Sequence, residues 1–153
     1  MVALEKGGVG IERSEAEAFP PLLWRGAGGE AYSGSDRLES VAWWNGNSND
    51  ETKPVGLKAP NALGLFDMSG NVYEWCADWY DSKFYEKCAA QGTELNPRND
   101  EVGSYRVLRG GSWIFPDPRY CRVANRGCVD PTYRGDGFGF RLAASPPGSV
   151  GGP

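Results

Sequence analysis

The sequence predicts a single α+β domain that is rich in short β-strands and irregular in its connections. Its 153 residues are enough for one domain with a hydrophobic core. Six Trp, seven Tyr and six Phe supply large side chains for that core. The 22 Gly and 11 Pro indicate that much of the chain forms loops and turns rather than helices. We therefore expect short strands joined by long, ordered connections.

The N-terminal part of the chain contains few patterns of regular structure. Residues 1–12 predict a flexible start. Ser14 to Glu17 form a capping-box pattern that predicts the first turn of a helix, which the following pair of prolines ends. The apolar segment from Leu38 to Trp44 closes with two tryptophans. We expect one of them in the core and one at its rim, with a ligand-stacking platform as the alternative.

The stretch from Pro60 to Trp79 is the one around which we expect the chain to be organised. The run from Asp67 to Asn71 predicts a tight turn in which Gly70 or Asn71 adopts a positive φ. The alternation of apolar and polar residues from Val72 to Cys76 then predicts a half-buried strand.

The C-terminal half is expected to contain three further short strands. Tyr80 to Gly103 is polar and predicts a loop, whereas Arg106 to Trp113 alternates as a strand that breaks at its two glycines. Cys121 to Arg126 and Gly139 to Ala143 predict the other two strands. Residues 146–153 are rich in Pro, Gly and Ser and predict a disordered tail.

The composition excludes several classes of function. The chain has no histidine, which excludes Ser–His and Cys–His catalytic triads as well as His-ligated zinc and iron sites. Its net charge is −4 and its arginines are interspersed with acids, so nucleic-acid binding is disfavoured. No apolar run reaches the length of a membrane span, and we recognise no signal segment.

Two acidic residues of the central stretch, Asp67 and Glu74, flank the predicted turn. Side-chain and backbone oxygens at this spacing suit a hard cation, Ca²⁺ above all. The alternative is a turn with two solvated acids, which is the usual situation of Asp and Glu near loops.

Four motifs occur in the chain in a recognisable order: NALGLFDMSGNVYEW at 61–75, RVLRGGSW at 106–113, CRVANR at 121–126 and GFRLA at 139–143. Together they resemble the formylglycine-generating-enzyme/sulfatase-modifying-factor family over a domain at about residues 13–145. The resemblance implies a variant of the C-type-lectin fold. Family members carry a long segment before the position of Ser14, so the resemblance implies an N-terminally abbreviated domain, either minimal or a fragment with an exposed sheet edge. It also assigns a structural Ca²⁺ to Asp67, the Gly70 and Val72 carbonyls and Glu74.

The cysteines bear on the enzymatic alternative. Formylglycine-generating enzymes bind copper through two thiolates shortly after the RGGS-type turn, and soft thiolates suit Cu(I). In this sequence the corresponding positions fall near Phe115 and Tyr120, so copper is not expected and the oxidase chemistry is expected to be lost. An oxidase would need Cys121 with Cys128 or Cys76 as a substitute pair.

The pairing of the four cysteines stays open. Cys76 and Cys121 lie in segments that resemble strands of the family, and they form either a disulfide or two buried thiols. Cys128 is expected as an exposed thiol in a loop, and the state of Cys88 is left undecided.

Residues 114–138 differ in composition from the rest of the chain. They contain no Lys, Glu, Gln, Met or Trp, which are the types that codons ending in a pyrimidine cannot encode. Adenine mutagenesis of Asn codons leaves this composition behind. The alternative is an ordinary turn-rich region, in which Gly, Asp, Pro and Tyr are common. The positions that look randomised are Ile114, Phe115, Asp117, Tyr120, Gly127, Cys128, Val129, Tyr133, Gly135, Asp136, Gly137 and Phe138.

This layout resembles the variable proteins of diversity-generating retroelements, several of which use a formylglycine-enzyme-like C-type-lectin domain. The resemblance implies a non-catalytic protein that binds a protein or glycan target through residues 114–138. The localisation stays open, with display on a cell or phage surface as one alternative. Tyr120, Tyr133, Phe115 and Phe138 are the expected anchors, and we expect their mutation to abolish binding with little effect on stability. The competing hypotheses are an oxidase that converts a substrate cysteine to formylglycine and an ordinary non-catalytic family member. The target and the oligomeric state stay open.

Overall fold

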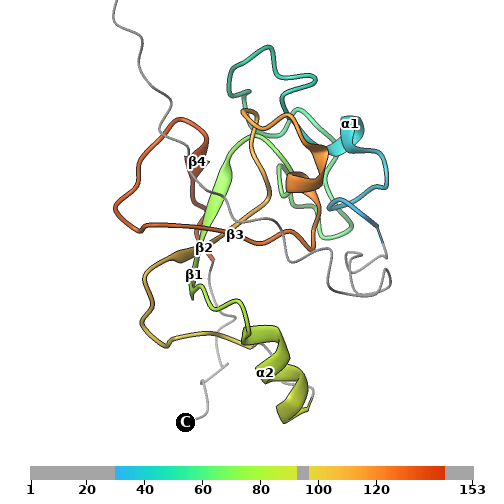
Figure 1. Cartoon of the computed structure of the whole chain (residues 1–153). Helices are drawn as coiled ribbons and strands as arrows, with labels where there is room; N and C mark the ends of the chain where they lie inside the picture. Colours follow the sequence, from blue (N-terminus) through green and yellow to red (C-terminus); the bar gives the residue numbers. More distant parts are fainter. Residues whose placement is uncertain (1–29, 93–96, 144–153) are drawn as a thin grey trace, which may run out of the picture.

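The structure is a computed structural model that describes residues 30–92 and 97–143. The predicted helix start and both terminal segments lie outside these residues. The described chain has one four-stranded sheet, a few short helices and long irregular connections (Figure 1). The predicted α+β architecture, with short strands and irregular loops, is therefore confirmed. The elements are α1 (Leu38–Val41), β1 (Tyr73–Trp79), α2 (Phe84–Gln91), β2 (Arg106–Arg109), the 3₁₀ helix η3 (Pro118–Cys121), β3 (Gly127–Val129) and β4 (Phe138–Gly139).

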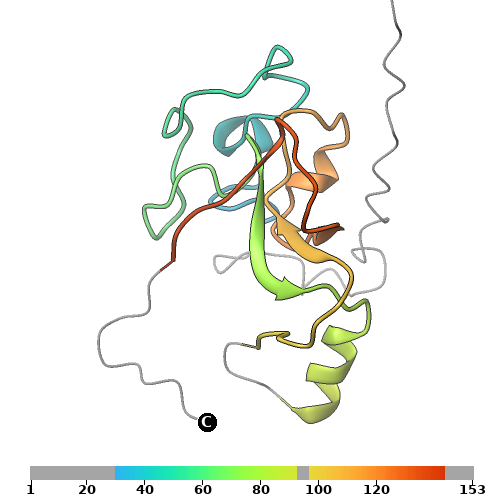
Figure 2. The ribbon, with the colours of Figure 1, turned by 90° about the vertical axis from the view of Figure 1, so that its left-hand side faces the viewer.

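One four-stranded sheet with the order β3-β2-β1-β4 forms the centre of the domain. β1 is antiparallel to β2 and parallel to β4, and β2 is antiparallel to β3. The register of β1 against β2 shifts between Trp75 and Trp79, and Figure 2 shows β1 bending along its length. Because side chains alternate across a strand, Tyr73 and Leu108 lie on one face of the sheet, and Glu74 and Arg109 lie on the other.

Two hydrophobic clusters hold this sheet and the loops together. The first contains Leu38 and Val41 of α1 together with Cys121, so α1 and η3 pack at the same end of the sheet (Figures 1 and 2). The second contains Tyr73, Leu108 and Val129 on one sheet face. α2 lies at the opposite end of the sheet from α1, and none of its residues is buried (Figure 1).

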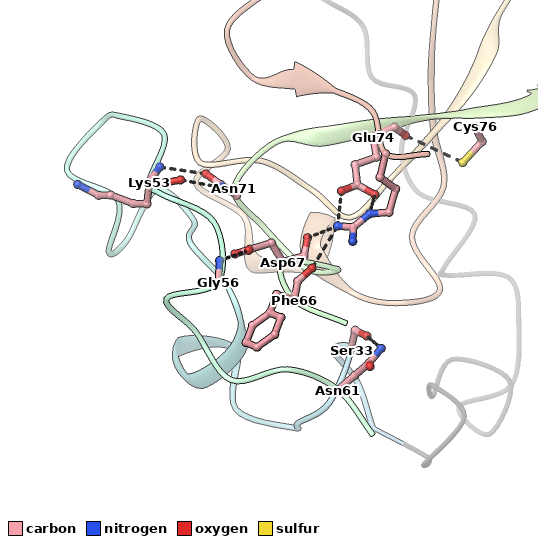
Figure 3. A network of polar contacts seen from close by, with 10 residues as sticks. Ser33, Lys53, Gly56, Asn61, Phe66, Asp67, Asn71, Glu74 and Cys76 are labelled. Carbon is pink, nitrogen blue, oxygen red and sulfur yellow. Dashed lines mark hydrogen bonds and ion pairs between the residues drawn. The ribbon is translucent and has the colours of Figure 1, made fainter. Parts of the chain in front are cut away.

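The turn that begins at Asp67 is hydrogen-bonded to two positions of the preceding loop, Trp43 and Lys53. Gly70 and Asn71 both adopt positive φ, 78° and 65°, as predicted, and Asp67 does so as well at 54°. The Asn71 side chain accepts a hydrogen bond from the Lys53 N–H and donates one to the Lys53 carbonyl, both at 3.0 Å (Figure 3). Its backbone N–H donates to the Trp43 carbonyl. This turn therefore fixes the loop after α1 against the start of β1.

Three predictions about regular structure were wrong. Tyr80 to Gly103 is not all loop, because strong helix formers build α2 and Gly92 ends it with a φ of 95°. Cys121 to Arg126 is not a strand, because Asp117 and Pro118 start η3 and the next strand begins only at Gly127. β4 covers Phe138–Gly139 rather than Gly139 to Ala143.

The two tryptophans of the first apolar segment are both half-buried, so neither is a fully buried core residue. Trp44 packs against the first hydrophobic cluster, and the ring of Trp43 lies 3.9 Å from the Lys58 ammonium group. No helix in the described part of the chain has the length and apolar character that a bilayer crossing requires.

Candidate binding face and cation site

Four predicted anchor residues come together around the buried ring of Tyr73. They are Phe115, Tyr120, Tyr133 and Phe138, which we call the aromatic face. The rings of Phe115 and Phe138 lie 5.5 Å and 6.0 Å from that of Tyr73. Tyr120 lies 5.3 Å from Phe115, and Tyr133 lies 5.0 Å from Phe138. Four side chains from one segment of the chain, residues 115–138, thus lie together over Tyr73.

The aromatic face is half-buried rather than fully exposed. All four rings pack against the cluster of Tyr73, Leu108 and Val129, and each keeps part of its surface open to solvent. Tyr73 itself is 0% exposed, and burial raises the pKa of its hydroxyl far above the usual range. The face is therefore anchored from below by a residue that solvent does not reach.

The structure divides the twelve predicted variable positions by exposure. Ile114, Gly135 and Asp136 are exposed around the aromatic face, and Asp117 is half-buried, where it caps η3. The Arg119 guanidinium beside Asp117, 2.8 Å from Oδ2, lowers the pKa of this carboxyl group. The buried positions are Gly127, Cys128 and Val129 of β3 together with Gly137.

These four buried positions do not form part of the surface. Cys128 and Val129 of β3 are buried, Val129 in the cluster with Tyr73 and Leu108, and a Cβ on Gly137 would lie 2.6 Å from Ile114 Cδ1 and from Ser112 Oγ. Cys128 was expected to be exposed in a loop, and this expectation was wrong, because the residue lies in the buried strand β3.

The cysteine positions do not fit a copper site. Phe115 and Tyr120, at the positions that the resemblance assigns to copper ligands, stack on one another instead. Cys121 is 2% exposed, and burial raises the pKa of its thiol to about 12. Burial also raises the pKa of Cys76, and both of these residues are free thiols rather than a disulfide. Since thiolates are the form that binds copper, a protonated Cys121 is a poor ligand.

The four predicted calcium ligands line one cavity of about 440 Å³, which we call the Asp67 cavity. Asp67, Gly70, Val72 and Glu74 all lie on its wall. Asp67 Oδ2 accepts a hydrogen bond of 2.8 Å from the Gly56 N–H, whereas Oδ1 is buried and has no hydrogen-bond partner among the described residues (Figure 3). A buried carboxylate oxygen without a donor fits a cation, because such an atom otherwise carries a desolvation penalty.

Glu74 points toward the same cavity and has a partner that the sequence analysis missed. The Arg141 guanidinium binds both of its carboxylate oxygens, with Nε 2.6 Å from Oε2 and Nη2 2.5 Å from Oε1. Nη2 also lies 3.2 Å from the carbonyl oxygens of Phe66 and Asp67. Arg141 belongs to the GFRLA motif, but no spacing rule connects it with an acid near the middle of the chain.

The bent sheet, the turn at Asp67 and the order of the four motifs define a domain of the formylglycine-generating-enzyme type with a C-type-lectin-like fold. The family model "Sulfatase-modifying factor enzyme 1-like domain" matches residues 23–146, and the chain belongs to this family.

Several relatives share this domain. A formylglycine-generating enzyme of Thermomonospora curvata is 42% identical over 98 residues, which are 62% of this chain and 32% of the enzyme. A serine/threonine-protein kinase, pkn1, of Chlamydia pneumoniae is 46% identical over 97 residues, 61% of this chain and 14% of the kinase. The solved structure of Treponema denticola variable protein 1 superimposes with a TM-score of 0.63 at 33% identity, covering 77% of this chain and 42% of that protein. The chain spans less than half the length of each of these relatives.

Proposed function

We propose that the protein recognises a protein or glycan target through the aromatic face and the exposed positions around it. The observation that carries this proposal is the convergence of Phe115, Tyr120, Tyr133 and Phe138 on one half-buried surface above Tyr73. These residues all come from the segment whose composition fits adenine mutagenesis. This arrangement supports a function in binding rather than catalysis.

The geometry of the aromatic face suits recognition. Rings that are packed on one side lose little further conformational freedom when a target covers the other side, so their apolar area stabilises a complex at low entropic cost. Aromatic and small adaptable residues of this kind also dominate antibody paratopes. Ile114, Gly135 and Asp136 surround the rings and are exposed, so their identity can change without disturbing the core.

The similarity to Treponema denticola variable protein 1 supports the proposal, since that protein carries the same kind of domain. The oxidase is the second candidate, because relatives of comparable identity are named formylglycine-generating enzymes. It ranks lower, since Phe115 and Tyr120 stand at the expected copper positions and the buried Cys121 thiol is held protonated.

The exposed positions provide the sharpest test of this proposal. A variant with Ile114→Arg and Asp136→Arg is expected to lose at least about tenfold in affinity for any target that the native chain binds, because two large cations are placed beside the aromatic face. Its melting temperature should stay close to that of the native protein, since exposed substitutions usually change stability by less than about 0.5 kcal/mol.

The measurement is a screen of the native chain on glycan and protein arrays, followed by titration of each hit with the variant. Glu101→Arg combined with Val102→Arg is the matched control, because both residues are exposed on a loop before β2. The proposed face would be contradicted if the Ile114/Asp136 variant bound a target with the affinity of the native chain, and the Glu101/Val102 control variant bound it more weakly.

We also propose that the Asp67 cavity holds a structural Ca²⁺. The residues that would bind it are Asp67, Glu74 and the carbonyl groups of Gly70 and Val72. When bound, the ion would neutralise acidic charge and hold the Asp67 turn against β1. The unpartnered Asp67 Oδ1 supports this proposal.

Removal of calcium is expected to lower the melting temperature. With calcium present at about a hundred times its Kd, the shift on chelation should be roughly 5–10 °C, from the free energy of ligand binding and the size of the domain. Thermal melts with calcium and with a chelator measure this shift. The Asp67→Ala variant, which removes the side-chain ligand, should show no shift, and Asp100→Ala, an exposed control, should behave as the native chain. Equal melting temperatures with and without calcium in the native chain would contradict the assignment.

A further inference from the structure

We propose that Arg141 and Ca²⁺ are competing occupants of the Asp67 cavity, so that Arg141 is a built-in cation that sets the calcium affinity. This inference rests on the calcium proposal above. Arg141 binds Glu74 through two parallel hydrogen bonds and contacts the carbonyl oxygens of Phe66 and Asp67. Carboxylate and carbonyl oxygens are also the ligands that Ca²⁺ selects.

The guanidinium group performs the structural task expected of the ion. It joins the Phe66–Asp67 segment to Glu74 on β1, two segments that the predicted calcium site would also join (Figure 3). The ion pair is partly shielded, because the side chains of Glu74 and Arg141 are 19% and 37% exposed. Planar, bidentate contacts between arginine and a carboxylate are among the stronger hydrogen bonds in proteins. Without calcium, this pair therefore holds the Phe66–Asp67 segment against β1.

Of the two carboxylates in the cavity, only Asp67 has an oxygen that a second cation can bind while Arg141 is in place. Its charged lining residues are Asp67, Glu74 and Arg141, which together carry a net charge of −1. Asp67 Oδ1 still lacks a partner, so a divalent ion has a ligand available there. Both oxygens of Glu74 are engaged by Arg141, however, and two cations that share one carboxylate repel each other at short distance. Calcium binding at Glu74 thus requires Arg141 to leave.

The position of Arg141 in the chain allows it to leave. It follows β4, whose last residue, Gly139, pairs with Glu74 of β1. Arg141 itself lies beyond the strand, and Phe140, which lines the same cavity, is exposed. Release of Arg141 therefore loosens the short segment from Phe140 to Ala143 and leaves the sheet intact.

Calorimetric titration of the full chain with CaCl₂, after chelator treatment, tests the competition. Arg141→Met is expected to bind calcium about tenfold more tightly than the native chain, because loss of the bidentate ion pair frees both carboxylate oxygens of Glu74. Arg134→Met, which removes an exposed arginine that lines no part of the cavity, should leave the affinity unchanged. Glu74→Gln should weaken binding strongly.

A second readout uses the native chain alone, so it does not depend on the folding of any variant. Hydrogen exchange at the Arg141 Nε–H should become faster when calcium is added, because this group loses its hydrogen bond to Glu74. Equal or weaker calcium binding by Arg141→Met, or unchanged or slower exchange of the Arg141 Nε–H with calcium, overturns the competition while leaving the calcium site standing. Absence of calcium binding by the native chain and by every variant overturns both proposals.

Discussion

Replacement of Tyr73 by alanine is expected to lower the free energy of unfolding by about 3–5 kcal/mol, which is the usual effect of truncating a buried aromatic residue. Tyr73 is 0% exposed and lies under the rings of Phe115 and Phe138. Its loss removes the base of the aromatic face as well as core contacts with Leu108 and Val129. The melting temperature should fall by roughly 10 °C, given the size of the domain.

Two matched variants separate the role of the ring from that of the hydroxyl group. Tyr73→Phe is expected to be neutral or slightly stabilising, because the buried hydroxyl has no hydrogen-bond partner within the described residues. Tyr105→Ala removes a tyrosine that is 48% exposed, and it should change stability by less than about 1 kcal/mol. Chemical denaturation of the three variants measures these differences. A Tyr73→Phe variant as unstable as Tyr73→Ala would mean that the hydroxyl, not the ring, supports the core.

Replacement of Gly70 by alanine is expected to lower the free energy of unfolding by about 2–5 kcal/mol, from backbone strain and steric overlap combined. Gly70 has a φ of 78°, and a Cβ at this position would lie 2.4 Å from the Trp43 carbonyl oxygen and 2.8 Å from the Trp43 nitrogen. Both are backbone atoms, and the carbonyl accepts the hydrogen bond of the Asn71 N–H. The loop after α1 would therefore have to move away from the turn.

Gly64→Ala is the control for this prediction. Gly64 has a similar φ of 75°, but a Cβ there would meet nothing within 4 Å, so only the backbone strain of about 1–2 kcal/mol is expected. Denaturant unfolding of the two variants isolates the steric contribution. Equal destabilisation of both would show that the close approach of Gly70 to Trp43 does not matter for stability.

The rings of the aromatic face are packed against the core on one side and open to solvent on the other. The rings of Phe115 and Phe138 were expected to be free surface anchors, yet they pack on Tyr73 and contribute to the core. Their truncation is therefore expected to reduce stability and binding together. Substitutions at exposed positions such as Ile114 and Asp136 separate the two effects, which is why the binding experiment uses them.

Local patterns in the sequence were sufficient to predict the turn and the two strands at the centre of the fold. The turn at Asp67, the positive φ of Gly70 and Asn71, and the strand from Tyr73 follow from short-range rules of turn chemistry and alternation. The strand that begins at Arg106 follows from the same alternation. The order of the four motifs also predicted the family, and the family model confirms it.

Contacts between distant segments decided the rest. Composition marked residues 114–138 as a unit, but only the pairing of β3 with β2 separates the buried Cys128 from the exposed Asp136. The ion pair of Glu74 with Arg141 joins residues that are 67 positions apart. Exposure and long-range pairing depend on what packs against a residue in space, and a linear pattern carries no information about that neighbour. The sequence by itself therefore determined the turn, the start of β1 and the extent of the candidate variable segment, and the tertiary structure decided which residues of that segment are exposed.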